Sequence, residues 1–310
     1  MVKRPVGIAL GGGGARGIAH IGVLRALRSR PEYMPSFVSG TSAGSIVAAL
    51  YAAGVNQERM EDEIRRFEWF SHVVNFHDTL KNYFDKKPGG LVSNSRLEDT
   101  VNEIIGGKSF SDLDTTLAVT ATDITAGRRV VFTTPSGAAK LNKKPLEEYL
   151  PPPEPSKPGF ETLVISDYEN IGKAVSASCA IPGIFQPVEI AGMRLVDGAV
   201  VDQVPVDIVR AFGCKPVIGV SLSFSTMPDR VSNLPALFGK VVWMLGVMQL
   251  RRSLDAADIG FEITGIEQRS IFDIHQYDLL DLGELDMRRQ LDSYEKTRAT
   301  IVDRIRSTKA

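Results

Sequence analysis

The chain has 310 residues, of which 43% are hydrophobic and 24% are charged, and its formal net charge at pH 7 is −1. This composition is typical of a globular protein with a well-developed core. The near-neutral charge argues against a general nucleic-acid binder, which carries a basic excess. The two cysteines, Cys179 and Cys214, are too few for a disulfide framework and lack the spacing of a metal site. We therefore expect buried free thiols in a reducing compartment.

The most apolar stretches are too short to cross a bilayer. Residues 6–10 follow two basic residues as in a signal peptide, but glycines interrupt the run at once. Residues 234–250 contain a proline and a lysine and are short for a span. Residues 1–30 hold six Lys or Arg and no acidic residue, which favours a solvated helix face over attraction to an anionic membrane surface. We expect a cytoplasmic protein, with peripheral membrane association as an open alternative.

Strands and helices alternate along the first part of the chain. Hydrophobic spacing and glycine positions predict the following order. The expected elements are a strand at 6–10, a tight loop at 11–14, a helix at 18–30, a strand at 36–39, an alanine-rich helix ending near Gly54, a helix carrying Met60 and Ile64, and a helix that a capping box at Ser95–Glu98 begins and Gly106-Gly107 ends.

The later part of the chain continues this pattern, with one irregular stretch. Proline-rich residues 151–158 cannot form regular structure, so we expect a surface insertion near 137–168 in a single domain of residues 1–310. A domain boundary there is the less favoured alternative. The remaining expected elements are strands at 116–122, 129–133, 192–196, 200–201 and 216–221, and a helical C-terminal segment at 223–310 with a surface helix at 284–306. Together these elements predict an α/β fold with a mostly parallel central sheet flanked by helices.

The strongest local motif is Gly40-Thr41-Ser42-Ala43-Gly44. A G-x-S-x-G sequence between a strand and a helix forms a sharp turn that lifts the serine hydroxyl above the sheet. Glycine is needed on both sides because a side chain would clash in so tight a turn. The following helix directs its positive end at the serine and favours negative charge that develops there. Ser42 is therefore the candidate nucleophile.

The second motif is the glycine run that precedes Ala15-Arg16-Gly17. Backbone amides in such a loop at a helix start form an anion site, as an acyl-transfer enzyme needs for the oxyanion of its tetrahedral intermediate. Arg16 would either support this loop and its anion or lie on the surface. Residues 12–17 also fit the G-x-G-x-x-G of dinucleotide folds. That fold expects an acid at the end of the second strand, and this strand runs into Ser39-Gly40 instead, so the nucleotide interpretation is disfavoured.

A serine nucleophile needs a base, and the histidines are poorly placed for that role. His20 lies on the first helix, where packing or hydrogen bonding is the favoured role, and His72 and His77 flank an apolar patch. His275 follows the candidate acids as in a Ser-Asp-His order, but its surroundings carry no catalytic pattern. A carboxylate is the alternative base. Asp197 follows an apolar strand and precedes a small-residue turn, with Asp123 a weaker rival and a turn-forming aspartate the simpler interpretation.

Taken in order, these motifs resemble the patatin-like phospholipases, including the catalytic region of neuropathy target esterase. The resemblance covers residues 6–222 and includes Ser178–Val188, which is similar to the family stretch before its Asp-Gly motif. It implies a patatin-like three-layer sandwich related to α/β hydrolases. It also implies a Ser42–Asp197 dyad that acts without histidine and oxyanion amides from Gly12, Gly13 and Gly14.

The resemblance further implies a hydrolase of carboxylic esters that forms an acyl-serine intermediate. The expected substrates are lysophospholipids, phospholipids or simpler carboxyl esters, without cofactor, metal or nucleic acid. Residues 234–250 would line the acyl chain or contact lipid, although a core helix or an oligomer contact explains them equally well. Two other classes stay open: an inactive lipid-binding or regulatory module of the same fold, and a dinucleotide-binding protein. The sequence leaves the oligomeric state undetermined.

Overall fold

The computed structural model describes residues 4–66, 93–141, 161–222, 249–266 and 275–308, together with Met244 and Arg269. Its strands are β1 Gly7–Leu10, β2 Phe37–Thr41, β3 Thr116–Asp123, β4 Arg128–Thr133, β5 Thr162–Ile165, β6 Val188–Ile190, β7 Met193–Asp197, β8 Val217–Leu222 and β9 Ile259–Ile263. Its α-helices are α1 Ile18–Arg28, α2 Ala43–Ala52, α3 Gln57–Arg66, α6 Ser95–Ile104, α7 Pro135–Leu141, α8 Ile171–Ser178, α9 Val206–Ala211 and α11 Asp278–Thr308.

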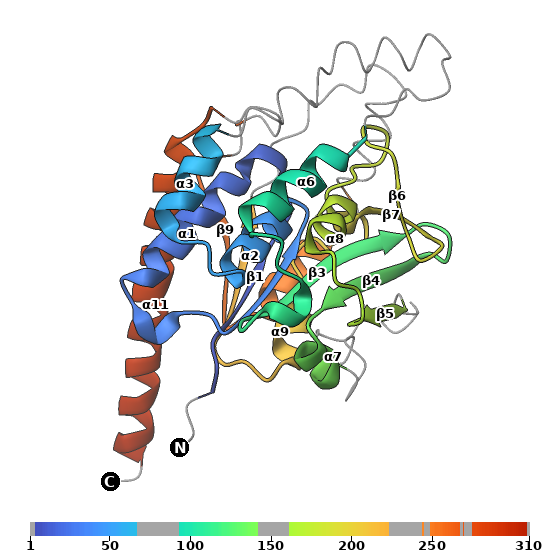
Figure 1. Ribbon diagram of the computed structural model, residues 1–310. Coiled ribbons are helices and arrows are strands. Elements are labelled where there is room, and N and C mark those ends of the chain that lie inside the picture. The colour runs from blue at the N-terminus through green and yellow to red at the C-terminus, as the bar shows by residue number, and fades with distance from the viewer. Residues whose placement is uncertain are drawn as a thin grey trace.

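These strands form one twisted sheet at the centre of the molecule (Figure 1). The order is β5-β4-β3-β2-β1-β8-β9, and β7 pairs with β3 and β6 off this path. The pairs from β3 through β2, β1 and β8 to β9 are all parallel. Antiparallel pairing is confined to β4 and β7 on β3 and to β6 on β7. The predicted mostly parallel α/β sheet is thus confirmed.

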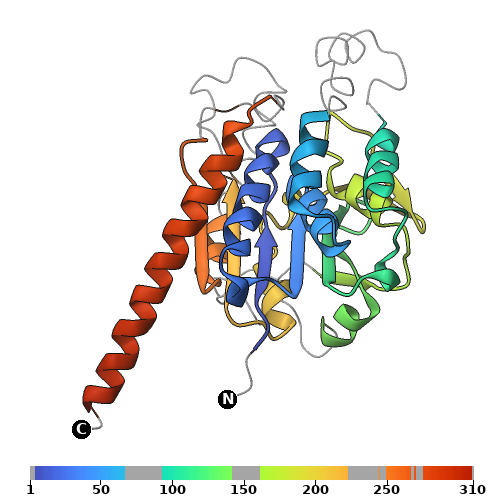
Figure 2. The same cartoon turned by 60° about the vertical axis from the view of Figure 1, so that its left-hand side comes forward.

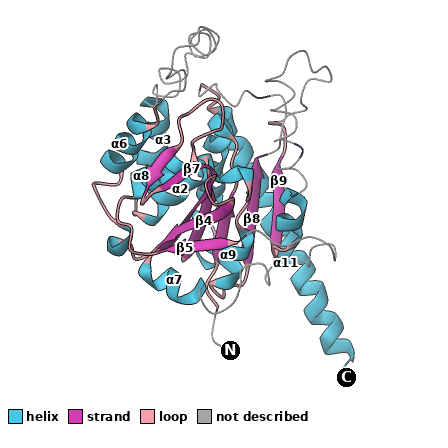
Figure 3. Ribbon diagram, turned by 90° about the vertical axis from the view of Figure 1, so that its right-hand side faces the viewer, coloured by secondary structure: helices cyan, strands magenta, loops and turns pink. Residues whose placement is uncertain are grey.

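Alternating side chains along the strands build a separate core on each face of the sheet. Ile8 and Leu10 join the larger core, which α1, α2, α6, α8 and α11 cover, whereas Ala9 between them faces the smaller core under α7 and α9. This alternation follows from the two-residue period of a strand, and burial on both faces explains the apolar runs. Helices therefore lie on both sides of the sheet, giving three layers (Figures 2 and 3).

The long C-terminal helix α11 lies against α1 and extends beyond the body of the domain (Figure 2). Glycines allow the two helices to approach closely. A Cβ on Gly22 would lie 1.9 Å from the Leu280 carbonyl oxygen, and one on Gly283 would lie 2.0 Å from that of Ala19. Contact this close fixes the crossing point, because any larger side chain would separate the helices.

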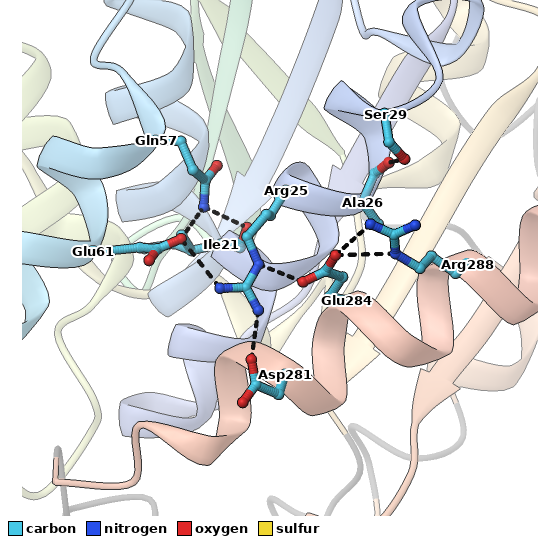
Figure 4. Close-up of polar contacts among 9 residues, drawn as sticks. All are labelled: Ile21, Arg25, Ala26, Ser29, Gln57, Glu61, Asp281, Glu284 and Arg288. Carbon is cyan, nitrogen blue, oxygen red and sulfur yellow. Dashed lines mark hydrogen bonds and ion pairs between the residues drawn. The ribbon is translucent and has the colours of Figure 1, made fainter.

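Ion pairs flank this crossing (Figure 4). Arg25 on α1 donates to Glu284 at 2.5 Å and to Asp281 at 2.6 Å, both on α11, and lies 3.5 Å from Glu61 on α3. Arg25 is only partly exposed, so its pairs are screened less than fully exposed ones. One arginine therefore joins three helices on this face of the domain.

Several local expectations need correction. Residues 200–201 form no strand, because Gly198–Val200 is a turn of 3-10 helix capped by the Asp197 side chain. The capping box at Ser95 is also wrong: Asn94 is the N-cap of α6 and makes no side-chain cap bond. The C-terminal segment includes a strand, β9, beside the helix α11.

The predicted insertion near 137–168 falls largely outside the described residues. Its flanks are regular, since residues 137–141 lie in α7 and residues 162–165 form β5. The lipid-facing role expected for residues 234–250 also falls almost wholly outside the described part. No helix among the residues that the structure describes is both long and apolar enough to span a bilayer.

Candidate active site

Ser42 sits on a strained turn between β2 and α2. Its backbone has φ 51° and ψ −126°, a conformation that residues with a side chain rarely adopt. Glycines on both sides permit the turn: a Cβ on Gly40 would lie 2.5 Å from the Gly44 carbonyl oxygen, and one on Gly44 would lie 2.2 Å from that of Leu10. The predicted strand-to-helix elbow is thus present, with the serine at the start of the helix.

A serine from another segment holds this turn. The Ser42 amide donates to Ser178 Oγ at 2.8 Å, and Ser178 Oγ donates to the Thr120 carbonyl at 2.6 Å. Ser178 is the last residue of α8, and Thr120 lies in β3, next to the strand that leads into the turn. The pair of hydrogen bonds ties the strained backbone to the sheet, which is how such a conformation persists.

Asp197 lies directly against the candidate nucleophile. Ser42 Oγ donates to Asp197 Oδ2 at 2.7 Å, and the Ala199 amide donates to Asp197 Oδ1 at 2.9 Å. Both side chains are buried, with 5% and 4% of their residue surfaces exposed. Asp197 ends β7, whose pairing with β3 brings it opposite Ala121, close to the carboxyl end of β2. The structure therefore brings together the two residues selected from the sequence.

Burial controls the acidity of this carboxyl group. Removal from water raises the pKa of Asp197 to about 6, while the hydrogen bonds from Ala199 and Ser42 oppose the rise. A carboxyl group with such a pKa is ionised at neutral pH and is a stronger base than aspartate in water. Its environment thus suits proton transfer from the adjacent hydroxyl.

The glycine loop, residues 11–14, lies beside Ser42. A Cβ on Gly12 would lie 3.2 Å from Ser42 Cβ, so the loop approaches the nucleophile through a residue without a side chain. The Gly12 amide donates to the Gln203 carbonyl at 3.2 Å. Within the described part of the chain, the Gly13 and Gly14 amides donate to no acceptor. Of the three amides expected to bind an oxyanion, that of Gly12 is therefore already hydrogen-bonded, and those of Gly13 and Gly14 are available.

Two side chains that the sequence did not mark as catalytic hold the carbonyls of the loop. Gln203 Nε2 donates to the Gly12 carbonyl at 3.0 Å, so Gln203 binds Gly12 through both backbone and side chain. His20 Nε2 lies 2.8 Å from the Gly11 carbonyl oxygen and must carry the proton to make this bond. Burial lowers the pKa of His20 to about 4, which keeps the ring neutral. His20 thus has the hydrogen-bonding role predicted for it.

Arg16 is buried rather than on the surface. Only 2% of its surface is exposed, and its guanidinium donates through Nε and Nη2 to the Arg269 carbonyl at 2.9 and 2.6 Å. Arg269 lies 253 positions further along the chain. Of the two roles considered for Arg16, support of the loop fits this arrangement, and a surface location is wrong.

The segment after Asp197 is fixed by a buried ion cluster. Arg129 on β4 donates to Asp202 at 2.6 Å and to Asp207 at 2.7 Å, and all three side chains are buried. Thr41, next to the nucleophile, donates to the Asp202 carbonyl at 2.9 Å. This cluster therefore anchors the stretch that links the candidate base to Gln203 and the glycine loop.

An apolar cavity of about 90 Å³ begins at Ser42. It extends between α1, α2, α3 and α6, and residues 179–185 close another side. Its surface is mostly apolar, which suits a hydrocarbon group next to the hydroxyl, and its polar lining residues are Ser42, Glu63, Asn94 and Cys179. Cys179 borders it as a buried free thiol whose pKa burial raises, and Cys214 is likewise buried and unpaired, as predicted.

The remaining candidates make other contacts or lie outside the described residues. Asp123 accepts from Arg128 Nε at 3.2 Å and from the Thr125 amide at 2.9 Å, so it closes the β3–β4 turn. His275 packs its ring against Tyr277. His72 and His77 lie outside the described residues. Among the residues with assigned structure, no group of three or more His, Cys, Asp or Glu side chains could hold a metal ion.

Comparison with known proteins adds relatives at low to moderate identity. An NTE family protein of Mycobacterium tuberculosis is 30% identical over 224 residues, 71% of this chain and 49% of the relative. Patatin-like phospholipase domain-containing protein 6 of Homo sapiens is 26% identical over 240 residues, 77% of this chain and 15% of that protein. The chain thus spans about half or less of the length of these two relatives.

A solved structure shares the fold of this chain, and the sequence identifies the family. The crystal structure of VipD from Legionella pneumophila matches with a TM-score of 0.52 at 16% identity, covering 94% of this chain and 67% of that chain, a likeness of fold alone. Residues 8–210 match the sequence profile described as patatin-like phospholipase. The chain therefore belongs to the patatin-like phospholipase family.

Proposed function

We propose that this protein hydrolyses carboxylic acyl esters, with Ser42 as nucleophile and Asp197 as base. The observation that carries the proposal is the 2.7 Å hydrogen bond from Ser42 Oγ to Asp197 Oδ2 at the entrance of an apolar cavity. Family membership favours lipid esters, such as lysophospholipids or phospholipids, as the substrates.

In the first half of the reaction, Asp197 accepts the Ser42 proton while Ser42 Oγ attacks the ester carbonyl carbon. The carbonyl oxygen takes the negative charge, and the Gly13 and Gly14 amides donate hydrogen bonds to it. The positive end of α2 favours the same charge. The tetrahedral intermediate then collapses, the alcohol leaves with the proton held by Asp197, and the acyl group stays on Ser42.

In the second half, water replaces the alcohol. Asp197 accepts a proton from this water as its oxygen attacks the acyl-Ser42 carbonyl. The second tetrahedral intermediate uses the same amides, and its collapse returns the proton to Ser42 Oγ and releases the carboxylic acid. The dyad ends in its starting state, so a single carboxylate serves as base in both halves.

Labelling with a fluorophosphonate probe tests this proposal, because only an activated serine reacts with such a probe. We expect wild-type protein to be labelled on Ser42 and Ser42→Ala to lose both labelling and the hydrolysis of chromogenic acyl esters. Ser221→Ala is the matched control. Ser221 is a buried serine on β8 whose hydroxyl has no hydrogen-bond partner among the described residues, so its loss should leave labelling unchanged.

Full esterase activity in Ser42→Ala would refute the proposal. Absence of labelling in correctly folded wild-type protein would instead favour a lipid-binding module that retains the fold. Retained activity in Asp197→Asn together with loss in His275→Ala would replace the dyad with a triad.

A further inference from the structure

The cavity beside Ser42 follows one stripe of helix α2. Four residues of α2 line it, at positions 43, 46, 47 and 50. The spacing of three, four and seven residues places these side chains on one face of the helix. The stripe begins at the residue after the nucleophile, so the cavity leads from the reacting hydroxyl along the helix axis.

The length of this stripe can be worked from helix geometry. Leu50 lies seven positions after Ala43, and at about 1.5 Å per residue this distance along the helix is about 10 Å. The facing helix α6 gives the same length, because its lining residues Leu97 and Ile104 are also seven positions apart. The lining residues of two different helices thus give the same length for the cavity.

Large apolar side chains line the end of the cavity that lies away from Ser42. Leu50, Met60 and Ile104 line it and belong to three different helices, and none is more than 4% exposed. These three residues are called the floor below. A floor of this kind cannot solvate a polar headgroup, but it can bury the methyl end of a hydrocarbon chain.

We propose that the cavity holds the acyl chain of the substrate and that the floor limits this chain to medium length. An extended chain advances roughly 1.25 Å per bond, given carbon–carbon bonds of about 1.5 Å, so about 10 Å accommodates roughly eight carbons. Longer chains must bend or leave carbons outside. The proposal deepens the function proposed above, since it assumes that the acyl carbonyl lies at Ser42.

A series of p-nitrophenyl esters from two to sixteen carbons measures this limit. We expect kcat/KM to rise by about fourfold per added methylene up to roughly eight carbons, as burial of each methylene predicts, and then to level off or fall. Leu50→Ala removes three side-chain carbons from the floor and so deepens the cavity. The preferred acyl chain should therefore become roughly two to three carbons longer. Ile46→Phe fills the middle of the stripe and should move the optimum to shorter chains.

Leu24→Ala is the matched control for Leu50→Ala. Leu24 is a leucine of α1 that is 1% exposed and belongs to the same core, but it does not line the cavity. Its truncation should lower the melting temperature without changing the preferred chain length. Circular dichroism and thermal melting establish which variants are folded before their profiles are compared.

A binding measurement separates this proposal from the proposed catalysis. Free fatty acids of four to sixteen carbons should raise the melting temperature of Ser42→Ala protein most near eight carbons, whether or not the wild type hydrolyses esters. Absence of ester hydrolysis with this fatty-acid optimum intact would refute the catalytic proposal alone. The proposal that the floor limits chain length would be refuted by either of two results. One is a wild-type chain-length profile with no optimum near eight carbons, and the other is a Leu50→Ala profile identical to that of wild type.

Discussion

Replacement of Asp197 by asparagine should raise the stability of the protein and abolish its activity. The carboxylate is buried next to Ser42, and burial raises its pKa from an ordinary value of 3.8 to about 6. Asparagine has the same size and can still accept the Ala199 amide hydrogen through Oδ1. It has no charge to bury and cannot accept a proton from Ser42. We therefore expect a more stable protein that is inactive.

The size of the stability change follows from the two pKa values. Protonated Asp197 favours the folded state, so its contribution is fully present below pH 3.8 and is lost as the pH rises through about 6. Above that pH, the ionised group costs the wild-type fold about 3 kcal/mol, since the two values differ by about two pH units at about 1.4 kcal/mol each. The neutral amide of Asp197→Asn carries no such cost. The free energy of unfolding of the variant should therefore exceed that of wild type by about 3 kcal/mol at pH 8 and by about half of that at pH 5.

Two assays check this prediction. Urea unfolding of wild type and Asp197→Asn at pH 5 and pH 8 gives the pH-dependent difference in the free energy of unfolding. The pH profile of wild-type kcat/KM should rise through about pH 6 to a plateau, because the base acts in its ionised form. Asp197→Asn should lose about 10⁴-fold or more in kcat, because replacing even the aspartate that only orients the base of a serine-protease triad costs about that much.

Equal stability of the two proteins at pH 8, or a stability difference independent of pH, would show that Asp197 is not a buried ionised carboxylate. An activity profile flat between pH 5 and pH 8 would show that some other group titrates in the catalytic step. Either result would refute the reasoning from burial to basicity.

Two further predictions concern the supports of the site. Gln203→Met removes the side-chain bond to the Gly12 carbonyl. It should lower kcat by about tenfold or more with KM little changed, because the oxyanion amides lose their alignment. Gln57→Met, at another buried glutamine, is the control and should spare kcat. Gly22→Ala inserts a Cβ 1.9 Å from the Leu280 carbonyl and should destabilise the fold by about 1–3 kcal/mol in urea unfolding. Unchanged stability there would show that α1 and α11 are not in close contact.

The parts of the site that could be predicted from sequence are those specified by local backbone chemistry. The turn at Ser42 was predictable because Gly40 and Gly44 tolerate contacts that no other residue permits. The strand–helix alternation was predictable from hydrophobic spacing over long elements. Asp197 was selected because it follows an apolar strand and no histidine was well placed, and the fold brings it to Ser42 through the pairing of β7 with β3.

The parts that escaped prediction depend on contacts between distant positions or on short elements. Gln203 binds a residue 191 positions away, and its own surroundings carry no motif. Helix α9 has only six residues and is too short to show a helical period. Helix α8 is rich in small residues, and its sequence IGKAVSAS gives a weak pattern. Ser178 lies in a stretch that resembles the family, but nothing local indicates that its hydroxyl holds the Ser42 amide.

The C-terminal segment belongs to the same structural unit as the proposed site, although the family match ends at residue 210. Strand β9 extends the sheet beside β8, and α11 covers α1 through a crossing at Gly22 and Gly283. The Arg269 carbonyl accepts hydrogen bonds from Nε and Nη2 of Arg16, which lies two positions after the last glycine of the loop. Loop alignment therefore depends on residues beyond the matched region, because a buried guanidinium without its acceptor would be strongly destabilising. A boundary drawn at residue 210 would keep Ser42 and Asp197 but remove the acceptor that holds Arg16 beside the glycine loop.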